Sequence, residues 1–370
     1  MIPLIIGSVL LTVCAAIIVR PNDRNLQFRG RYDIVEASNE VRFDLPSFGI
    51  TIGVVDTTNV KLLLKAYRDV GVPNRLWVYI DGIRTSQVID TSSFLNDTLY
   101  EIEIASNLSV SRHTIQVSKI TEADLNAIVP TDNYLTFAGF VLDNGNSIPL
   151  KPISSRKIEF IGDSIMGGYC NLCEGDYTGQ SGDLSWSSLT CDNFGADCHI
   201  VSWAGYGLVR NCCGGTTYMP EIFTRKLLSV PGSVWNYSSW IPDAVVINLG
   251  TNDNPSPDDP AFEAEFEQTY VQFVKNISSS YHLNTTFFLG CGPMSSVYCT
   301  NVKNVISQLA QQSPEIPVYF LDQTNVLNAT NQCCGHPNTV GDVTIADSST
   351  AFLAGVLNWS YVSNLWALKV

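Results

Sequence analysis

Four short stretches of the chain carry residue types that together could cleave an ester through a serine nucleophile. They span residues 157–169, 202–207, 248–253 and 335–338. Such chemistry needs a nucleophile, a base that takes its proton, and hydrogen-bond donors for the oxyanion that forms. In chain order the stretches offer Ser164, Gly205, Asn252 and His336. The first question is therefore whether the fold can bring these four residues together.

Ser164 is the candidate nucleophile because of what precedes it. Ile158–Ile161 is a short run rich in β-branched residues, which suits a buried strand of a parallel sheet. Gly162 and Asp163 then break the strand, so Ser164 is expected just beyond its carboxyl end, where open α/β sheets bind ligands. The alternative is that Asp163 and Ser164 only cap the helix that follows.

His336 is the candidate base, since histidine titrates near neutral pH. The chain has four histidines: His113, His199, His282 and His336. His336 is followed by Pro337 and precedes a stretch expected to be the last helix. The alternative for His336, if its block is considered without the other three, is a helix-capping or core role.

Three groups could stabilise an oxyanion: the backbone N–H of Ser164, the backbone N–H of Gly205, and the side-chain amide of Asn252. Glycine allows the backbone to approach the reacting carbon closely, and the asparagine amide supplies donors without charge. The alternatives are an ordinary turn at Gly205, and an Asx turn or helix cap at Asn252.

The four stretches, taken as a set over roughly residues 155–365, resemble the blocks of the SGNH (GDSL-type) hydrolases. Ahead of them lie Gly30-Arg31 and a strand-like run that reads His113-Thr114 and then Lys119-x-Thr121-Glu122. This combination resembles carbohydrate esterase family 2. The resemblance implies removal of O-acetyl groups from polysaccharide through an acyl-serine intermediate, without metal or organic cofactor.

One position departs from the wider family. Many SGNH enzymes carry an aspartate three residues before the histidine, whereas this chain has Cys333, followed by Cys334. We expect Cys333 to form a disulfide. A carbonyl oxygen can accept the imidazole N–H in place of a carboxylate, and family 2 includes such Ser-His dyads, so the resemblance implies a dyad here. A weakened site is the alternative.

The cysteines and the N-terminus predict export. Eleven cysteines are present, and all but Cys14 lie from Cys170 onward, which favours a disulfide framework. The alternative is a metal site that uses the Cys170-x-x-Cys173 spacing. Residues 2–19 are almost continuously apolar, with small residues near Cys14, so we predict a signal peptide over residues 1–20. An uncleaved membrane anchor is the alternative.

Seven Asn-x-Ser/Thr sequons predict N-linked glycans in a secreted eukaryotic chain. They lie at Asn96, Asn107, Asn236, Asn276, Asn284, Asn328 and Asn358.

The pattern of apolar runs predicts two domains. Residues 21–142 contain short strand-like runs separated by turn residues, with a hairpin signal at Asp81-Gly82, and predict a β-sandwich of the jelly-roll type. Residues 143–155 read as a short linker that fixes the two domains against each other. Residues 156–370 alternate strands and helices, which predicts an α/β domain with a doubly wound parallel sheet.

The apolar runs predict strands in both domains and helices in the second. In the first domain the strands are 50–55, 60–66, 76–80, 99–104, 114–117 and 135–142. In the second the strands are 158–161, 199–203, 244–249, 286–290 and 318–321, and the helices are 185–196, 261–280, 301–312 and 342–359.

Composition narrows the function classes. A net charge of −14 without a basic patch argues against nucleic acid and anionic membranes as partners, and membrane contact is expected only if residues 1–20 are retained. A neutral acetylated polysaccharide is compatible with this charge. Two other functions stay open: a lipid or small-ester hydrolase on the same scaffold, and an extracellular structural or glycan-binding protein with an idle site.

Overall fold

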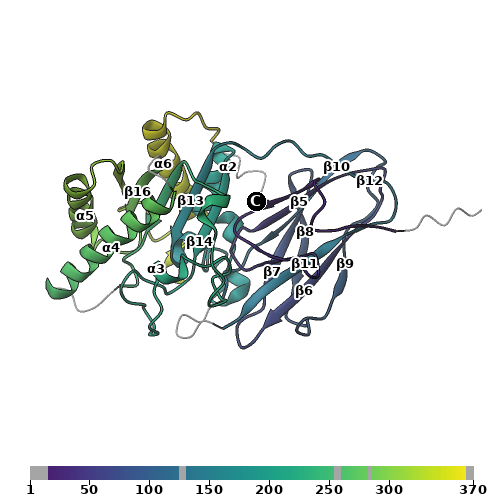
Figure 1. Cartoon of the computed structure of the whole chain (residues 1–370), viewed down its shortest axis with the longest axis horizontal. Helices are drawn as coiled ribbons and strands as arrows, with labels where there is room; N and C mark the ends of the chain where they lie inside the picture. Colours follow the sequence, from purple (N-terminus) through teal and green to yellow (C-terminus); the bar gives the residue numbers. More distant parts are fainter. Residues whose placement is uncertain (1–15, 125–130, 254–259, 282–284, 364–370) are drawn as a thin grey trace, which may run out of the picture.

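The computed structural model describes residues 16–124, 131–253, 260–281 and 285–363, so Cys14, Asn284 and most of the predicted signal peptide lie outside the described residues. The chain forms an antiparallel sandwich followed by a parallel α/β layer structure, and the two pack side by side (Figure 1). The predicted fold class is confirmed.

The sandwich consists of two six-stranded sheets. One contains β1 (Ile17–Val19), β3 (Asp33–Val35), β4 (Glu40–Phe43), β6 (Val60–Arg68), β9 (Tyr100–Ala105) and β11 (Asn133–Leu142). The other contains β2 (Leu26–Arg29), β5 (Gly49–Val55), β7 (Arg75–Ile80), β8 (Ile83–Asp90), β10 (Arg112–Lys119) and β12 (Asn146–Ile148). Side chains from both inner faces, among them Phe43, Ile52, Leu62 and Phe137, form one buried core.

All six strands expected in the sandwich are present, and six shorter or more polar ones were not anticipated. Asp81 and Gly82 both have positive φ, at 55° and 80°, and connect β7 to β8 as the hairpin signal predicts. The hairpin signal implies this second strand, but β8 had no expected range because its residues are largely polar and partly exposed, so it lacks an apolar run.

Two short strands lie in segments that the sequence did not assign to the sandwich: the predicted signal peptide and the predicted linker. β1 lies inside the segment 1–20, pairs with β11, and buries Val19. A cleavage that leaves this strand intact would fall before Ile17, next to the small residues noted above. β12 lies inside the predicted linker and pairs with β5, so part of that segment completes the sandwich.

The second sheet is entirely parallel, in the order β14-β13-β15-β16-β17. Its strands are β13 (Lys157–Gly162), β14 (Asp197–Ser202), β15 (Ala244–Asn248), β16 (Thr286–Cys291) and β17 (Val318–Asp322). The longer helices are α2 (Trp186–Phe194), α4 (Pro260–Tyr281), α5 (Cys299–Gln312) and α6 (Thr339–Leu357). These nine elements match the ranges expected from sequence to within a few residues.

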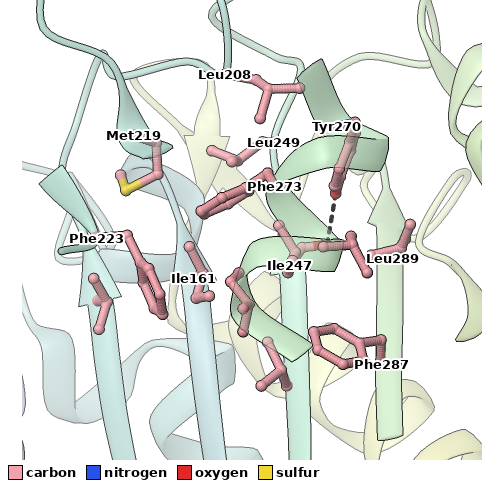
Figure 2. Packing of buried hydrophobic residues seen from close by; sticks show 14 of the residues in the cluster. Ile161, Leu208, Met219, Phe223, Ile247, Leu249, Tyr270, Phe273, Phe287 and Leu289 are labelled. Carbon is pink, nitrogen blue, oxygen red and sulfur yellow. Dashed lines mark hydrogen bonds between the residues drawn. The ribbon is translucent and has the colours of Figure 1, made fainter. Parts of the chain in front are cut away.

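Helices cover both faces of this sheet. α4 and α5 pack on one face with Ile161, Ile247 and Leu289, whereas α2 and α6 pack on the other with Phe160 and Val246. Figure 2 shows Tyr270 and Phe273 of α4 lying across the strand residues, and the Tyr270 hydroxyl donates to the Ile247 carbonyl at 3.3 Å. Because the chain leaves β13 toward β14 and returns to β15 on the other side, the order reverses at β13. That reversal opens a crevice at the carboxyl ends of these strands.

The two domains are joined by buried polar contacts. Arg31 of the sandwich and Glu159 of β13 form an ion pair at 2.8 Å with both side chains fully buried. Asp183, in the α/β domain, accepts hydrogen bonds from Ser47, Ser118 and the Tyr79 hydroxyl of the sandwich. These contacts support the expected fixed interface.

Candidate active site

Ser164 lies at the expected place, just beyond β13 and at the start of the short helix α1 (Ser164–Gly167). Asp163 caps this helix, since its Oδ1 accepts the Ile165 N–H at 3.0 Å. The capping role considered for the Asp-Ser pair therefore belongs to Asp163, while the Ser164 hydroxyl points elsewhere. Its Oγ lies 2.8 Å from Nε2 of His336, so the first and last sequence blocks meet.

His336 is held by backbone and not by a carboxylate. It lies in β19 (His336–Pro337), which pairs with β18 (Gln332–Cys333). Its Nδ1 is 3.1 Å from the carbonyl oxygen of Cys334. If the Nδ1 proton is donated to this carbonyl, Nε2 is left as an acceptor for the Ser164 hydroxyl. Among the described residues, no carboxylate is hydrogen-bonded to either ring nitrogen of His336.

Cys333, which occupies the position of the usual aspartate, forms a disulfide with Cys173, and Cys334 forms one with Cys170. The loop that carries His336 is thus fastened to the segment just after α1. Asp342, the first aspartate after His336, lies in α6 and accepts hydrogen bonds from the Asn171 side chain and the Trp186 N–H.

The ten cysteines from Cys170 onward are all paired. The other pairs are Cys191–Cys198, Cys212–Cys213 and Cys291–Cys299. Cys170 and Cys173 therefore belong to two disulfides and not to a metal site. Within the described residues, no cluster of three or more metal-ligating side chains is present.

The pH dependence of activity should reflect His336. Burial lowers the pKa of its imidazole below the usual 6.5, and the Cys334 carbonyl partly opposes this effect. Because the base must be neutral to take the serine proton, the acid limb of the kcat/KM profile should fall only at pH values below 6.5. A pH profile of kcat/KM measures this limb directly. A midpoint above 6.5 would contradict the assignment of His336 as a buried base.

Gly205 follows β14 in a turn with φ of 81°, a backbone conformation that favours glycine. Its carbonyl accepts the Cys212 N–H at 3.0 Å, which holds the loop closed. Neither the Gly205 N–H nor the Ser164 N–H donates to any residue that the structure describes. Both are therefore free to donate to an oxyanion.

Asn252 lies just beyond β15 and connects the other blocks. Its Nδ2 donates to Asp163 Oδ2 at 3.1 Å and to the Tyr206 carbonyl at 2.9 Å. Both amide hydrogens are thus engaged, one by the residue before Ser164 and one by the residue after Gly205. An oxyanion contact would require one of these bonds to lengthen, so the donor role of Asn252 stays a prediction.

Substitution of Asn252 by alanine tests that role. We expect kcat to fall by about 10²–10³-fold, the usual effect of losing one oxyanion donor, together with some loss of stability because two buried hydrogen bonds disappear. Steady-state kinetics and thermal unfolding separate the two effects. A folded variant that keeps more than about a tenth of wild-type kcat would argue for a purely structural asparagine.

Buried carboxyl groups behind the site were not singled out from the sequence. Asp253 accepts the N–H groups of Leu208, Val209 and Arg210 at 2.7–2.9 Å and so holds the loop that follows Gly205. Burial raises the pKa of Asp163 to about 7. Asp163 directly precedes Ser164 and Asp253 directly follows Asn252, and this adjacency to predicted site residues is the feature of the sequence that could have identified them.

Four aromatic residues in or near the sequence blocks, which could offer flat apolar faces to a sugar, lie in different parts of the structure. Trp203 and Tyr206 are fully buried in the core. The Tyr169 ring lies 4.8 Å from the His336 ring, so Tyr169 lines the site. Trp240 precedes β15 and lies at the opposite end of the sheet, in a cavity of about 590 Å³ that Tyr32 also lines.

Comparison with known proteins places these features in a family. A model of the GDSL-like Lipase/Acylhydrolase family matches residues 158–348. The cellulase/esterase CelE of Acetivibrio thermocellus is 28% identical over 279 residues, which are 72% of this chain and 33% of that protein. An acetylxylan esterase / glucomannan deacetylase of Cellvibrio japonicus is 26% identical over 267 residues, covering 65% of this chain and 69% of that protein.

The fold has solved counterparts. A family two carbohydrate esterase from Clostridium thermocellum, in complex with cellohexaose, superposes with a TM-score of 0.79 at 23% identity and covers 90% of this chain and 99% of that one. The chain spans only a third of the length of CelE. The match over residues 158–348 contains the candidate residues of all four blocks and covers more than half of the chain, so the chain belongs to the GDSL-like lipase/acylhydrolase family.

Proposed function

We propose that this protein is a secreted carbohydrate esterase that removes O-acetyl groups from a polysaccharide through a Ser164–His336 dyad. The observation that carries the proposal is the 2.8 Å contact between Ser164 Oγ and His336 Nε2, with Nδ1 turned to the Cys334 carbonyl. A nucleophile and a base in hydrogen-bond contact, with the base oriented by a third group, are the parts that acyl transfer needs.

The reaction has two halves. His336 Nε2 takes the Ser164 proton as Oγ attacks the acetyl carbonyl carbon, and the carbonyl oxygen becomes an oxyanion that the Ser164 and Gly205 N–H groups stabilise. The C–O bond to the sugar then breaks, and His336 returns the proton to the leaving sugar hydroxyl. Water, deprotonated by His336, then attacks the acetyl-serine carbonyl. The bond between the acetyl carbon and Ser164 Oγ breaks, His336 returns the proton to Oγ, and acetate is released.

The substrate class is supported by the relatives. Two of them carry acetylxylan esterase and glucomannan deacetylase in their names, and a family two esterase was solved with cellohexaose. The five disulfides suit an oxidising compartment, which supports export and the N-linked glycans predicted for it.

The test is release of acetate from acetylated xylan and acetylated glucomannan by the purified protein, measured beside a long-chain fatty ester. Acetate from the glycans, with little turnover of the fatty ester, is expected. Preference for the fatty ester would favour a lipid hydrolase, and a folded protein without turnover of either would favour a binding or structural role.

A further inference from the structure

The segment Lys119–Asp124 leaves β10 of the sandwich and runs against the loop that carries Gly205. We propose that Glu122, a sandwich residue, is a positioning residue that holds this loop, Ala204-Gly205, in place for acyl transfer. The inference rests on the proposed function, because Gly205 is its oxyanion donor. It assigns to the N-terminal domain a part in the reaction and not only in the interface.

Glu122 touches both halves of the site. Its Oε2 accepts the backbone N–H of Ala204, the residue before Gly205, at 3.1 Å. Its Oε1 lies against Gly167, the last residue of α1, so closely that a Cβ there would be only 2.3 Å away. Since α1 begins with Ser164, one carboxyl group fixes the spacing between the nucleophile helix and the oxyanion loop.

The segment itself is held firmly. Lys119 Nζ donates to the carbonyl oxygens of Thr121 and Glu122 at 2.6 and 2.7 Å, and the Glu122 N–H donates to Gln180 Oε1 at 3.0 Å. Lys119 is fully buried, as is Glu122 apart from 1% of its surface. Glu122 therefore has little freedom to follow the loop if the loop moves.

A second contact joins the same two segments. The indole N–H of Trp203 donates to the Asp124 carbonyl, and Ala123 packs in the same buried cluster as Trp203 and Tyr206. Trp203, just before Ala204-Gly205, is thus hydrogen-bonded to the segment Lys119–Asp124, and Glu122 adds a second hydrogen bond at Ala204 itself.

Burial of this carboxyl is unfavourable for stability unless its hydrogen bonds offset the loss of water. Only Oε2 has a partner, and Oε1 has none within the described residues. An apolar side chain would fill the same space at lower cost. What an apolar side chain could not do is accept the Ala204 N–H and so orient the peptide that leads into Gly205.

The protonation state of Glu122 adds a distinct signature. Burial raises its pKa to about 8, with Asp163 and Asp124 acting in the same direction and Lys119 in the opposite one. Below this pH the carboxyl is neutral and its oxygen still accepts the Ala204 N–H. Above it, a negative charge forms behind the loop and disfavours the developing oxyanion, so activity should decline as pH rises through about 8.

The test compares Glu122→Ala, Glu122→Asp and Glu122→Gln. Alanine removes the carboxyl group that accepts the Ala204 N–H, and aspartate, which is shorter by one methylene, places its carboxyl group farther from that N–H. Both variants should therefore lower kcat by about 10²-fold, the effect of misplacing a catalytic group by about 1 Å, with little change in KM. Glutamine keeps an acceptor, so its kcat near pH 7 should stay close to wild type. It cannot ionise, so it should also lose the alkaline decline.

Two controls sharpen the comparison. Asp183→Asn removes the charge of another buried interdomain carboxyl, whose partners are the sandwich residues Ser47, Ser118 and Tyr79, and should lower the melting temperature without lowering kcat. The rate at which a fluorophosphonate labels Ser164 gives a second readout, in which Oγ displaces fluoride at phosphorus. Because labelling needs no glycan, it tests Glu122 even if acetylated xylan is not the substrate.

The proposal would be overturned by wild-type kcat and labelling rates in Glu122→Asp or Glu122→Ala. An alkaline decline that persists in Glu122→Gln would also count against it. If Glu122→Ala does not fold, Glu122→Asp and Glu122→Gln still decide the matter, since both retain a polar side chain at the site.

Discussion

Replacement of Ser164 by alanine should lower acetate release by about 10⁶-fold. In the proposed mechanism the Oγ atom forms the covalent bond to the acetyl group, and no other side chain that the structure describes is hydrogen-bonded to His336 Nε2. The fold should be unchanged, because the helix cap is supplied by Asp163 and not by the serine hydroxyl.

The design includes His336→Ala and the double variant Ser164→Ala/His336→Ala. Members of one catalytic unit lose activity non-additively, so the double variant should be no slower than the worse single one. Near-ultraviolet circular dichroism checks the fold of each. Acetate release by a folded Ser164→Ala protein within about 10²-fold of wild type would exclude the acyl-serine route.

The paired disulfides Cys170–Cys334 and Cys173–Cys333 should together have the largest effect on stability. Each closes a loop of about the same length, with sequence separations of 164 and 160. Removing both should lower the free energy of unfolding by about 5 kcal/mol, as loop-closure entropy predicts for such a span. Removing one alone should cost much less, because the other still closes nearly the same loop.

Cysteine-to-alanine variants of each pair, and of both, can be compared by equilibrium urea unfolding. Cys191–Cys198 has a sequence separation of only 7 and serves as the matched control for loop length. Loss of both pairs should also lower kcat, since Cys333 and Cys334 lie beside His336. Equal losses of stability from one pair and from both would contradict the shared-loop explanation.

The sequence predicted much of the α/β domain because its signals are local. Short apolar runs alternate along the chain with segments whose apolar residues recur at helical spacing. This pattern predicted all five strands and the four longer helices to within a few residues of their observed bounds. The sandwich was predicted less completely. Strands such as β2 and β12 are three or four residues long and gain their definition from pairing with β5, which a local pattern does not reveal.

Some features of the candidate site were likewise evident from local motifs, and others were not. Ser164 and His336 were identified from their own blocks, and the cysteine at position 333 already suggested a base without a carboxylate. Which carbonyl would orient the base depended on the turn at Cys334, and a non-glycine residue with φ of 52° there is not evident from sequence.

By itself, then, the sequence determined the family, the order of the domains, and the residue types available for acyl transfer, because each is written in contiguous motifs. Only the tertiary structure decided the disulfide pairing, the double engagement of Asn252, and the contact of Glu122 with Ala204, which lie 82 positions apart. The disulfides and the Asn252 contacts depend on long-range packing within the α/β domain, and the Glu122–Ala204 contact depends on how the two domains pack. Such long-range packing leaves no periodic trace in a single chain.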